Sequence, residues 1–410
     1  MVAARGRCSR GFDALTQPLT VVTDAGTRGA WMVALLFAAI AAASLPYGWM
    51  LARKRAPPLA AQFAIGIAAL AIAWCSPVLF SSDVYAYAAY GELARLGLNP
   101  YAYVAPMPGD VLISDAMWQW NGTLPICVYG PGFVAIASAV VALLAPLGAL
   151  AQLQGMRVLD SVALLGCIAL AYAGFGGKRG SGLRAAAVIC LNPVAIWCAA
   201  EGHNDALALA ATLAGFALVR ANLPTAGGAL TALSALIKSP GAAAATGLAV
   251  SDRRARIGAA LGLTVAIAVS FPLIAAAATR VLPHGQYAPQ ASLQAAFALL
   301  GGPAAIALSV VIAAGLAAHA LALARARRDE GWIWLGLAAW ALIPNPYPWY
   351  ALWLTALAAL APKTRAATVA ILLSFTSLLR YVPDAIAAPS PPIRVALGIL
   401  AALPFAALLI

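Results

Sequence analysis

Long apolar runs broken by short polar stretches dominate this chain. Most runs are roughly 15–22 residues long, close to what a helix needs to cross a bilayer, and the alternating strands of about 10 residues that mark a membrane barrel are not seen. Helical spans are therefore predicted near 31–51, 59–80, 157–175, 183–200, 203–220, 226–237, 240–250, 257–279, 302–324, 331–345, 348–361, 366–380 and 393–410. The pattern predicts an all-α polytopic membrane protein, a bundle of about 13 transmembrane helices.

Some runs depart from a simple span. Lys238-Ser239-Pro240 and the stretch from Pro344 to Tyr350 predict broken helices, since proline ends a helix. The run 132–150 contains Pro146 and is expected to be a partial or surface-lying helix. Residues 1–30 are polar, and the run after them is longer than the core of a usual signal peptide, so a retained first span is favoured over a cleaved signal. We expect one integral-membrane domain over 1–410.

Composition agrees with a membrane protein. The chain is 63% hydrophobic and 9% charged, whereas soluble domains carry about 25% charged residues. The net charge of +12 comes from arginines in short loops, which fits the positive-inside rule better than a nucleic-acid partner. The six cysteines form no CxxC motif, so neither a disulfide framework nor a zinc site is expected.

The basic loops predict an orientation. The basic residues near 53–55, 178–184, 253–256, 325–328 and 363–365 are expected in the cytoplasm. The loop 81–130, which carries a juxtamembrane helix, then falls on the outer face, together with 201–205, Lys238 and 344–350. If 132–150 crosses fully, 178–184 lies outside instead.

Asp83 comes directly after an apolar run, in SSDVYAYAAYGELARLGLNPY. A carboxylate so close to lipid is costly and is usually functional or firmly paired. On a helix, Asp83, Tyr87 and Tyr90 share one face. One acid among tyrosines suits a general base facing a sugar hydroxyl, and structural pairing of Asp83 is the alternative.

The rest of this helix has a simpler interpretation. Glu92 lies about 180° around the helix from Asp83 and is expected to pair with Arg95. Gly97 is expected to end the helix, and Asn99 begins a turn with the following proline. Asn99 is included among the substrate-binding candidates.

A second polar cluster, Glu201-Gly202-His203-Asn204-Asp205, lies between two apolar runs. We interpret it as part of a binding site, and the alternative is that Asn204 or Asp205 only caps a helix. No metal-ligand motif is present. A divalent cation is nevertheless a candidate cofactor if Glu201 and Asp205 meet Asp83, and zinc is disfavoured because histidines are few.

Cations and aromatic turns complete the candidate site. Lys238 between two apolar half-helices predicts a phosphate contact, with snorkelling to the headgroups as the alternative. Arg280 and Arg380 end apolar runs, where a phosphate contact and interface anchoring are equally consistent. The turns with Tyr129 and with Tyr347, Trp349 and Tyr350 are candidates to stack on sugar or hold isoprenoid chains, or else form an interfacial aromatic belt.

An ordered set of motifs resembles a known family. SDVYAYAAYG, GLNPY, YGP, NPVAIW, EGHNDALAL, LSALIKSP and NPYPWY occur in this order across roughly 75–355. Together they resemble the polyprenol-phosphate-mannose-dependent α-1,6-mannosyltransferases, which are membrane enzymes of the GT-C superfamily. By position, Asp83 matches the family's catalytic acid, 203–205 match its GHND segment and Lys238 matches its lysine before proline.

The resemblance implies a GT-C-like glycosyltransferase of the bacterial inner membrane, with its active site on the periplasmic, outer face. It would transfer a sugar, expected to be mannose, from a polyprenyl-phosphate donor to a glycan or lipid-linked acceptor, with inversion. Its partners would be that donor, that acceptor and membrane lipid.

Two other classes of function stay open. A transporter or flippase for lipid or lipid-linked sugar often contains broken helices, but it also shows internal repeats, and none is evident in this sequence. A scaffold subunit of an envelope complex is the third class, and it predicts that Asp83 is dispensable. No GxxxxGK[ST] motif occurs, which argues against ATP-driven transport.

Overall fold

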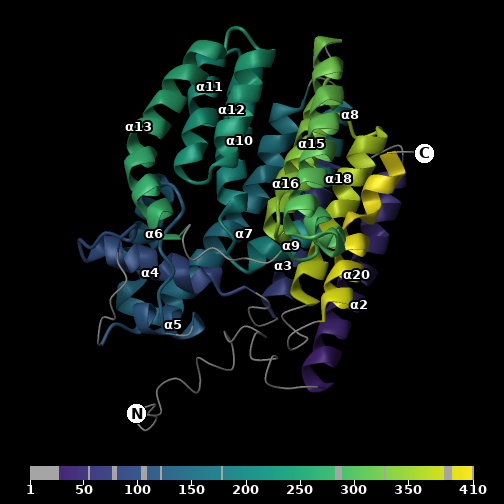
Figure 1. Cartoon of the computed structure of the whole chain (residues 1–410). Coiled ribbons are helices and arrows are strands. Elements are labelled where there is room, and N and C mark those ends of the chain that lie inside the picture. Colours follow the sequence, from purple (N-terminus) through teal and green to yellow (C-terminus); the bar gives the residue numbers. More distant parts are fainter. Residues whose placement is uncertain are drawn as a thin grey trace. The chain divides into compact units, whose positions relative to one another are not determined.

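The computed structural model describes residues 27–53, 56–75, 81–102, 109–120, 122–176, 179–281, 289–326, 328–382 and 390–408. Over these residues the regular secondary structure is entirely helical (Figure 1). The predicted all-α class is confirmed. Most of the polar N-terminal segment predicted at 1–30 lies outside the described residues, as does the end of the span predicted at 59–80.

The described residues form two compact units, one from 67–170 and 199–281 and the other from 27–66, 171–198 and 289–408. The single domain over 1–410 stays a prediction. The first unit holds most of α7 (Ala149–Gly174) and all of α4 (Asp83–Arg95), α5 (Val111–Gln119), α6 (Pro131–Leu144), η2 (Ala145–Leu147), α10 (Asp205–Arg220), α11 (Pro224–Leu233), η3 (Ser234–Leu236), α12 (Pro240–Ser251) and α13 (Arg256–Val281).

Within the first unit, α11 packs against α10, α12 and α13, and α4 packs against α5 and α6. Ala232, Ala245 and Ala259, one from each of α11, α12 and α13, are buried together, because small side chains let helix backbones approach closely. The Thr212 and Ser234 hydroxyls, 2.9 Å apart, join α10 to η3. In Figure 1, α4, α5 and α6 lie together at one end of the α10–α13 group.

The second unit is a bundle of helices with a packed apolar interior. Tyr47 donates a hydrogen bond to the carbonyl oxygen of Val188 (2.7 Å) and so joins α2 to α8, while α15 packs on α16 and α17 on α18. Its elements are α2 (Thr27–Ala52), α8 (Arg179–Cys190), α14 (Leu293–Ala296), η5 (Ala298–Leu300), α15 (Gly302–Arg325), α16 (Glu330–Leu342), η6 (Pro348–Tyr350), α17 (Ala351–Ala358), α18 (Arg365–Thr376), η7 (Ser377–Tyr381), α20 (Pro391–Ala402) and η8 (Leu403–Leu408). Three helices contribute residues to both units: α3 (Leu59–Trp74), α7 and α9 (Pro193–Ala200).

Fewer helices than predicted have the length of a span. In the described part of the chain, four are long and apolar enough to cross a membrane, and a bent pair brings the number to five at most. The predicted count of about 13 is therefore not confirmed. Several predicted runs fold as shorter helices, among them the 8-residue α9 and the 8-residue α17.

Proline and asparagine explain several helix ends. The run predicted as one span at 183–200 is two helices bent by 57°, because Asn192 and Pro193 interrupt it. The run predicted at 157–175 begins earlier, at Ala149, so Arg157 lies inside α7 rather than at its start. The breaks predicted at 238–240 and 344–350 are confirmed. The 14-residue α6 ends before Pro146 and spans about 21 Å, which agrees with a partial helix.

Candidate active site

Asp83 opens α4 and keeps access to solvent. Its backbone N–H donates a hydrogen bond to Ser81 Oγ (3.3 Å), and its side chain is 21% exposed, whereas the helix is buried from Val84 to Leu93. A carboxylate in the first turn is also favoured by the helix dipole. The helix thus presents one accessible acid at the end of a buried segment.

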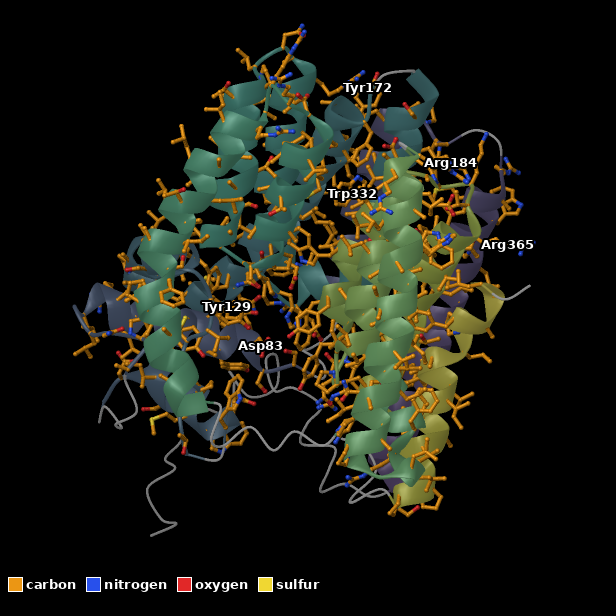
Figure 2. All side chains as sticks on the ribbon, turned by 45° about the horizontal axis from the view of Figure 1, so that its top comes forward. Asp83, Tyr129, Tyr172, Arg184, Trp332 and Arg365 are labelled. Carbon is orange, nitrogen blue, oxygen red and sulfur yellow. The ribbon has the colours of Figure 1, made fainter. Side chains whose placement is uncertain are left out.

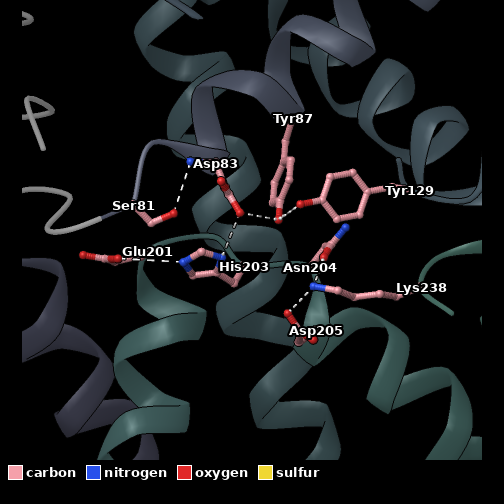
Figure 3. Close-up of polar contacts among 9 residues, drawn as sticks. All are labelled: Ser81, Asp83, Tyr87, Tyr129, Glu201, His203, Asn204, Asp205 and Lys238. Atoms are coloured by element: carbon pink, nitrogen blue, oxygen red, sulfur yellow. Dashed lines mark hydrogen bonds and ion pairs between the residues drawn. The ribbon is translucent and has the colours of Figure 1, made fainter. Parts of the chain in front are cut away.

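Tyrosines surround this carboxylate. The hydroxyl of Tyr87 lies 3.3 Å from Asp83 Oδ2 and 3.1 Å from the hydroxyl of Tyr129 (Figure 3). The Tyr87 ring makes edge contacts with Tyr129 and Phe133 at centroid distances of 5.0 Å and 4.9 Å. Tyr90, one turn further, donates to the Pro125 carbonyl at 2.9 Å. The predicted shared face of Asp83 and Tyr87 is confirmed, and Figure 2 shows Asp83 and Tyr129 close together.

The segment with Tyr129 is fastened to the segment with Lys238. Tyr101 donates to the Tyr129 carbonyl (2.9 Å), and the Gly130 N–H donates to the Ile237 carbonyl (3.3 Å). A Cβ on Gly130 would collide with the carbonyl oxygen of Leu236, so a residue without a side chain is required.

The other end of α4 is a closed structural turn. Arg95 donates to both carboxylate oxygens of Glu92 at 2.5 Å and 2.7 Å, which confirms the predicted pair. Gly97, with φ +73°, follows the helix end as predicted. The side chain of Asn99 accepts the backbone N–H of Tyr101 at 2.9 Å, so it shapes the turn.

The second polar cluster is buried and gathers around Lys238. The ammonium of Lys238 lies 2.5 Å from Asp205 Oδ2 and 3.1 Å from Asn204 Oδ1. Asn204 occupies the N-cap position of α10, but its side chain makes no capping hydrogen bond, so the cap alternative is wrong for it. Lys238 is only 7% exposed and pairs with Asp205, so the snorkelling alternative is also wrong.

His203 lies between two carboxyl groups (Figure 3). Its Nδ1 is 3.7 Å from Asp83 Oδ2, and its Nε2 is 3.9 Å from Glu201 Oε2. Both His203 and Glu201 are buried. The structure therefore brings together most of the predicted site residues of the first unit, from Asp83 on α4 to Lys238 after η3.

Burial sets the protonation of this cluster. It raises the pKa of Asp83 to about 6, although Lys238 and Tyr87 act in the opposite direction. Burial, and secondarily the charge of Lys238, lower the pKa of His203 well below its usual range. At neutral pH, Asp83 is largely ionised with a pKa close to that of a useful general base, and His203 is neutral.

The described residues offer no metal centre. None of their groups of three or more His, Cys, Asp or Glu side chains could hold a metal ion. The divalent cation considered from the sequence thus has no ligand set in the part of the chain that the structure describes.

Four predicted residues belong to the second unit. Tyr347 stacks on Trp349 at 4.4 Å, and the Arg380 guanidinium lies 4.8 Å from the Tyr347 ring and donates to its hydroxyl at 3.1 Å. Tyr350 meets both rings edge-on. Because Arg380 is buried, simple interface anchoring does not describe it. The side chain of Arg280 lies outside the described residues.

Two residues of α7 were not predicted. Arg157 donates to the Ala200 carbonyl (2.7 Å) and its guanidinium lies 4.5 Å from the Trp74 ring, so it holds the chain just before Glu201. Asp160 is buried with Asp205 and Lys238 as its charged neighbours. The available signal was an arginine and an aspartate three residues apart in an apolar run, where ionisable residues are rare.

Comparison with known proteins places the chain in a family. Residues 4–253 match the family model described as alpha-(1->6)-mannopyranosyltransferase, N-terminal domain. Over 180 residues the chain is 32% identical to alpha-(1->6)-mannopyranosyltransferase A of Mycobacterium tuberculosis, a match that covers 42% of this chain and about a third, 34%, of that relative. No solved structure matches.

The family match covers more than half of the chain and includes Asp83, the 201–205 segment and Lys238. It agrees with the resemblance in the ordered motifs, and the apolar helices agree with a membrane protein. The chain is therefore a helical membrane protein that belongs to the alpha-(1->6)-mannopyranosyltransferase family.

Proposed function

We propose that the chain is a membrane mannosyltransferase of the GT-C type. It transfers mannose from a polyprenyl-phosphate donor to a hydroxyl of a glycan or lipid-linked acceptor, with inversion at the anomeric carbon. One observation carries the proposal: Asp83 is an accessible carboxylate with a pKa of about 6 in a cluster of tyrosines and buried polar groups. Family membership and the activity for which the relative is named support mannose as the sugar.

In the reaction, Asp83 takes the proton from the acceptor hydroxyl. The acceptor oxygen bonds to the anomeric carbon while the bond from that carbon to the phosphate oxygen breaks, and its electron pair leaves with polyprenyl phosphate. A single displacement of this kind inverts the anomeric carbon. General bases of this type contribute about 10²–10⁴-fold to a rate.

Lys238 supplies positive charge beside the base. Its ammonium, held by Asp205 and Asn204, lies 5.5 Å from the centre of the Tyr129 ring. We assign this ammonium to the phosphate of the donor, so that it would interact with the phosphate and with Asp205 at the same time. Tyr87, Tyr90 and Tyr129 provide aromatic faces and hydroxyls for sugar.

The remaining candidates are assigned to the long substrates. Arg280, Arg380, Tyr347, Trp349 and Tyr350 are proposed to contact the phosphate, the isoprenoid chain or the glycan acceptor, and Asn99 to support the loop that carries Tyr101. The site is proposed to face the periplasm from the bacterial inner membrane, since the basic loops are expected in the cytoplasm.

The test is sugar transfer by the purified protein in liposomes. Polyprenyl-phosphate mannose, with a glycolipid extract as acceptor, should give a mannosylated product, and transfer should vanish in Asp83→Ala. Transfer that persists in the variant would refute the assignment of Asp83 as the general base. Movement of labelled donor lipid between leaflets in the absence of acceptor, with no transfer from mannose, glucose or pentose donors, would favour a flippase.

A further inference from the structure

The side chain of His203 stands between the base and a second acid. Its nitrogens face Asp83 Oδ2 at 3.7 Å and Glu201 Oε2 at 3.9 Å (Figure 3). The His203 side chain is 1% exposed and that of Glu201 3%, against 21% for Asp83. Substrate can therefore reach Asp83, while His203 and Glu201 lie behind it and act through it.

A neutral imidazole carries one N–H donor and one acceptor nitrogen, so His203 can donate to only one of these two carboxylates. Burial keeps the ring neutral, as the lowered pKa of His203 indicates. A deeply buried carboxylate such as Glu201 gains more from a donor than one that keeps contact with water, as Asp83 does. The arrangement favours the proton on Nε2.

We propose that Glu201 holds His203 as the Nε2–H tautomer, so that Nδ1 accepts a hydrogen bond from Asp83 once Asp83 has taken the acceptor's proton. The inference rests on the proposed function of Asp83 and deepens it. No proton moves to His203, which stays neutral, and atoms balance as in the displacement above. His203 and Glu201 are thus positioning residues that stabilise the protonated product form of the base.

The backbone between the two residues suits this role. Gly202 has φ +86°, a left-handed conformation that side chains rarely adopt, and a Cβ there would lie 3.1 Å from Val84 Cγ2 and 3.4 Å from Arg157 Cγ. The tight turn at Gly202 lets the Glu201 carboxylate face Nε2 of His203, two residues along the chain. Arg157 is a charged neighbour of Glu201.

Both ring contacts are longer than a hydrogen bond, at 3.7 Å from Nδ1 to Asp83 Oδ2 and 3.9 Å from Nε2 to Glu201 Oε2. The tautomer therefore follows from the burial and charge of the two carboxylates rather than from these distances, and catalytic hydrogen bonds often shorten only when the reaction proceeds. The other groups that face Asp83 are Tyr87 on its own helix, Tyr129 before α6, Asp205 on α10 and Lys238. None of these four occupies the position of His203 between the two acids.

The decisive variant is Glu201→Gln. A glutamine amide can donate or accept, so the anionic Asp83 becomes the stronger acceptor and draws the ring proton to Nδ1, while the amide NH2 donates to Nε2. The Nδ1–H then donates to the ionised Asp83 and makes it a weaker base. The acid limb of the pH profile of kcat/KM should move to lower pH and kcat should fall about tenfold with little change in KM. Glu201→Asp, which keeps the carboxylate, should retain the wild-type limb. A fall in kcat with an unmoved limb in Glu201→Gln would overturn the proposal.

A spectroscopic readout does not depend on activity. The chain has three histidines, so ¹⁵N-histidine spectra, assigned with His284→Gln and His319→Gln, report the tautomer of His203 directly. We expect the proton on Nε2 in the wild type and on Nδ1 in Glu201→Gln. A wild-type proton on Nδ1, or no switch in the variant, would overturn the tautomer assignment whether or not the protein proves to be a transferase.

Discussion

Helix α4 carries two carboxylates with opposite surroundings. Glu92, near its C-terminal end, is 4% exposed and gripped by Arg95 through two hydrogen bonds, which lower its pKa. Asp83, at the N-terminal end, has no arginine against it in the described structure, and burial raises its pKa to about 6. One helix of 13 residues therefore holds an acid fixed in its ionised form and an acid poised to exchange a proton.

This contrast separates structure from chemistry. When the environments of two carboxylates move their pKa values in opposite directions, the two groups can be given different roles in acid–base chemistry. Glu92 is satisfied locally, by a residue one turn away. The surroundings of Asp83 come from residues far away in the sequence, His203 and Lys238, which lie near it only in the folded chain.

The largest expected effect is on turnover. Asp83→Asn removes the base and should lower kcat by about 10²–10⁴-fold, whereas Glu92→Gln, the matched change on the same helix, should alter it less than about twofold. Rates of mannose transfer in liposomes, with circular dichroism to confirm folding, would measure both. Equal losses in the two variants would remove the distinction between the two acids.

The next effect is on stability, through Lys238. Lys238→Met leaves Asp205 charged and buried without its partner, which typically costs about 3–5 kcal/mol, while Arg328→Met breaks a mostly exposed pair with Glu330 worth about 0.5 kcal/mol. Thermal unfolding in detergent should show a large drop in Tm for the first variant and almost none for the second. Lys238→Met/Asp205→Asn should recover most of the loss, and a normal Tm for Lys238→Met alone would contradict a buried ion pair.

The smallest effect is on pH dependence. A raised pKa means that Asp83 stays protonated, and inactive as a base, to higher pH than an ordinary aspartate. Below about 6, kcat/KM should fall tenfold per pH unit. Glu92→Gln should leave this limb in place, because the pKa of Glu92 is lowered and it is already ionised there. An acid limb near pH 4 would show that burial does not raise the pKa of Asp83.

The periodicity of the sequence predicted the features that depend on contacts between residues close together in the chain. The spacing of Asp83, Tyr87, Glu92 and Arg95 gave the contacts along α4, and the prolines gave the breaks after α11 and α16. The motifs also identified the family. These features depend on residues one to two helical turns apart.

Tertiary contacts were less accessible. The placement of Arg157 and Asp160 depends on α7 beginning at Ala149, which hydropathy alone did not indicate because Gln152 and Gln154 interrupt the apolar run. The count of about 13 spans is not confirmed, because apolar runs such as those of α9 and α17 fold as helices of eight residues, each too short to cross a bilayer alone. A short helix buried inside a protein and a helix buried in lipid both consist mainly of apolar residues, so composition does not distinguish them.

Gly130 limits how this protein can vary. Its missing side chain lets the Tyr129 segment rest on the backbone at Leu236 and Ile237, next to Lys238. An aromatic group and a cation from distant parts of the chain thus keep their spacing through one backbone contact. A saturation library selected for transfer should return glycine alone at this codon, while Leu96, exposed on the same unit, should accept many residues.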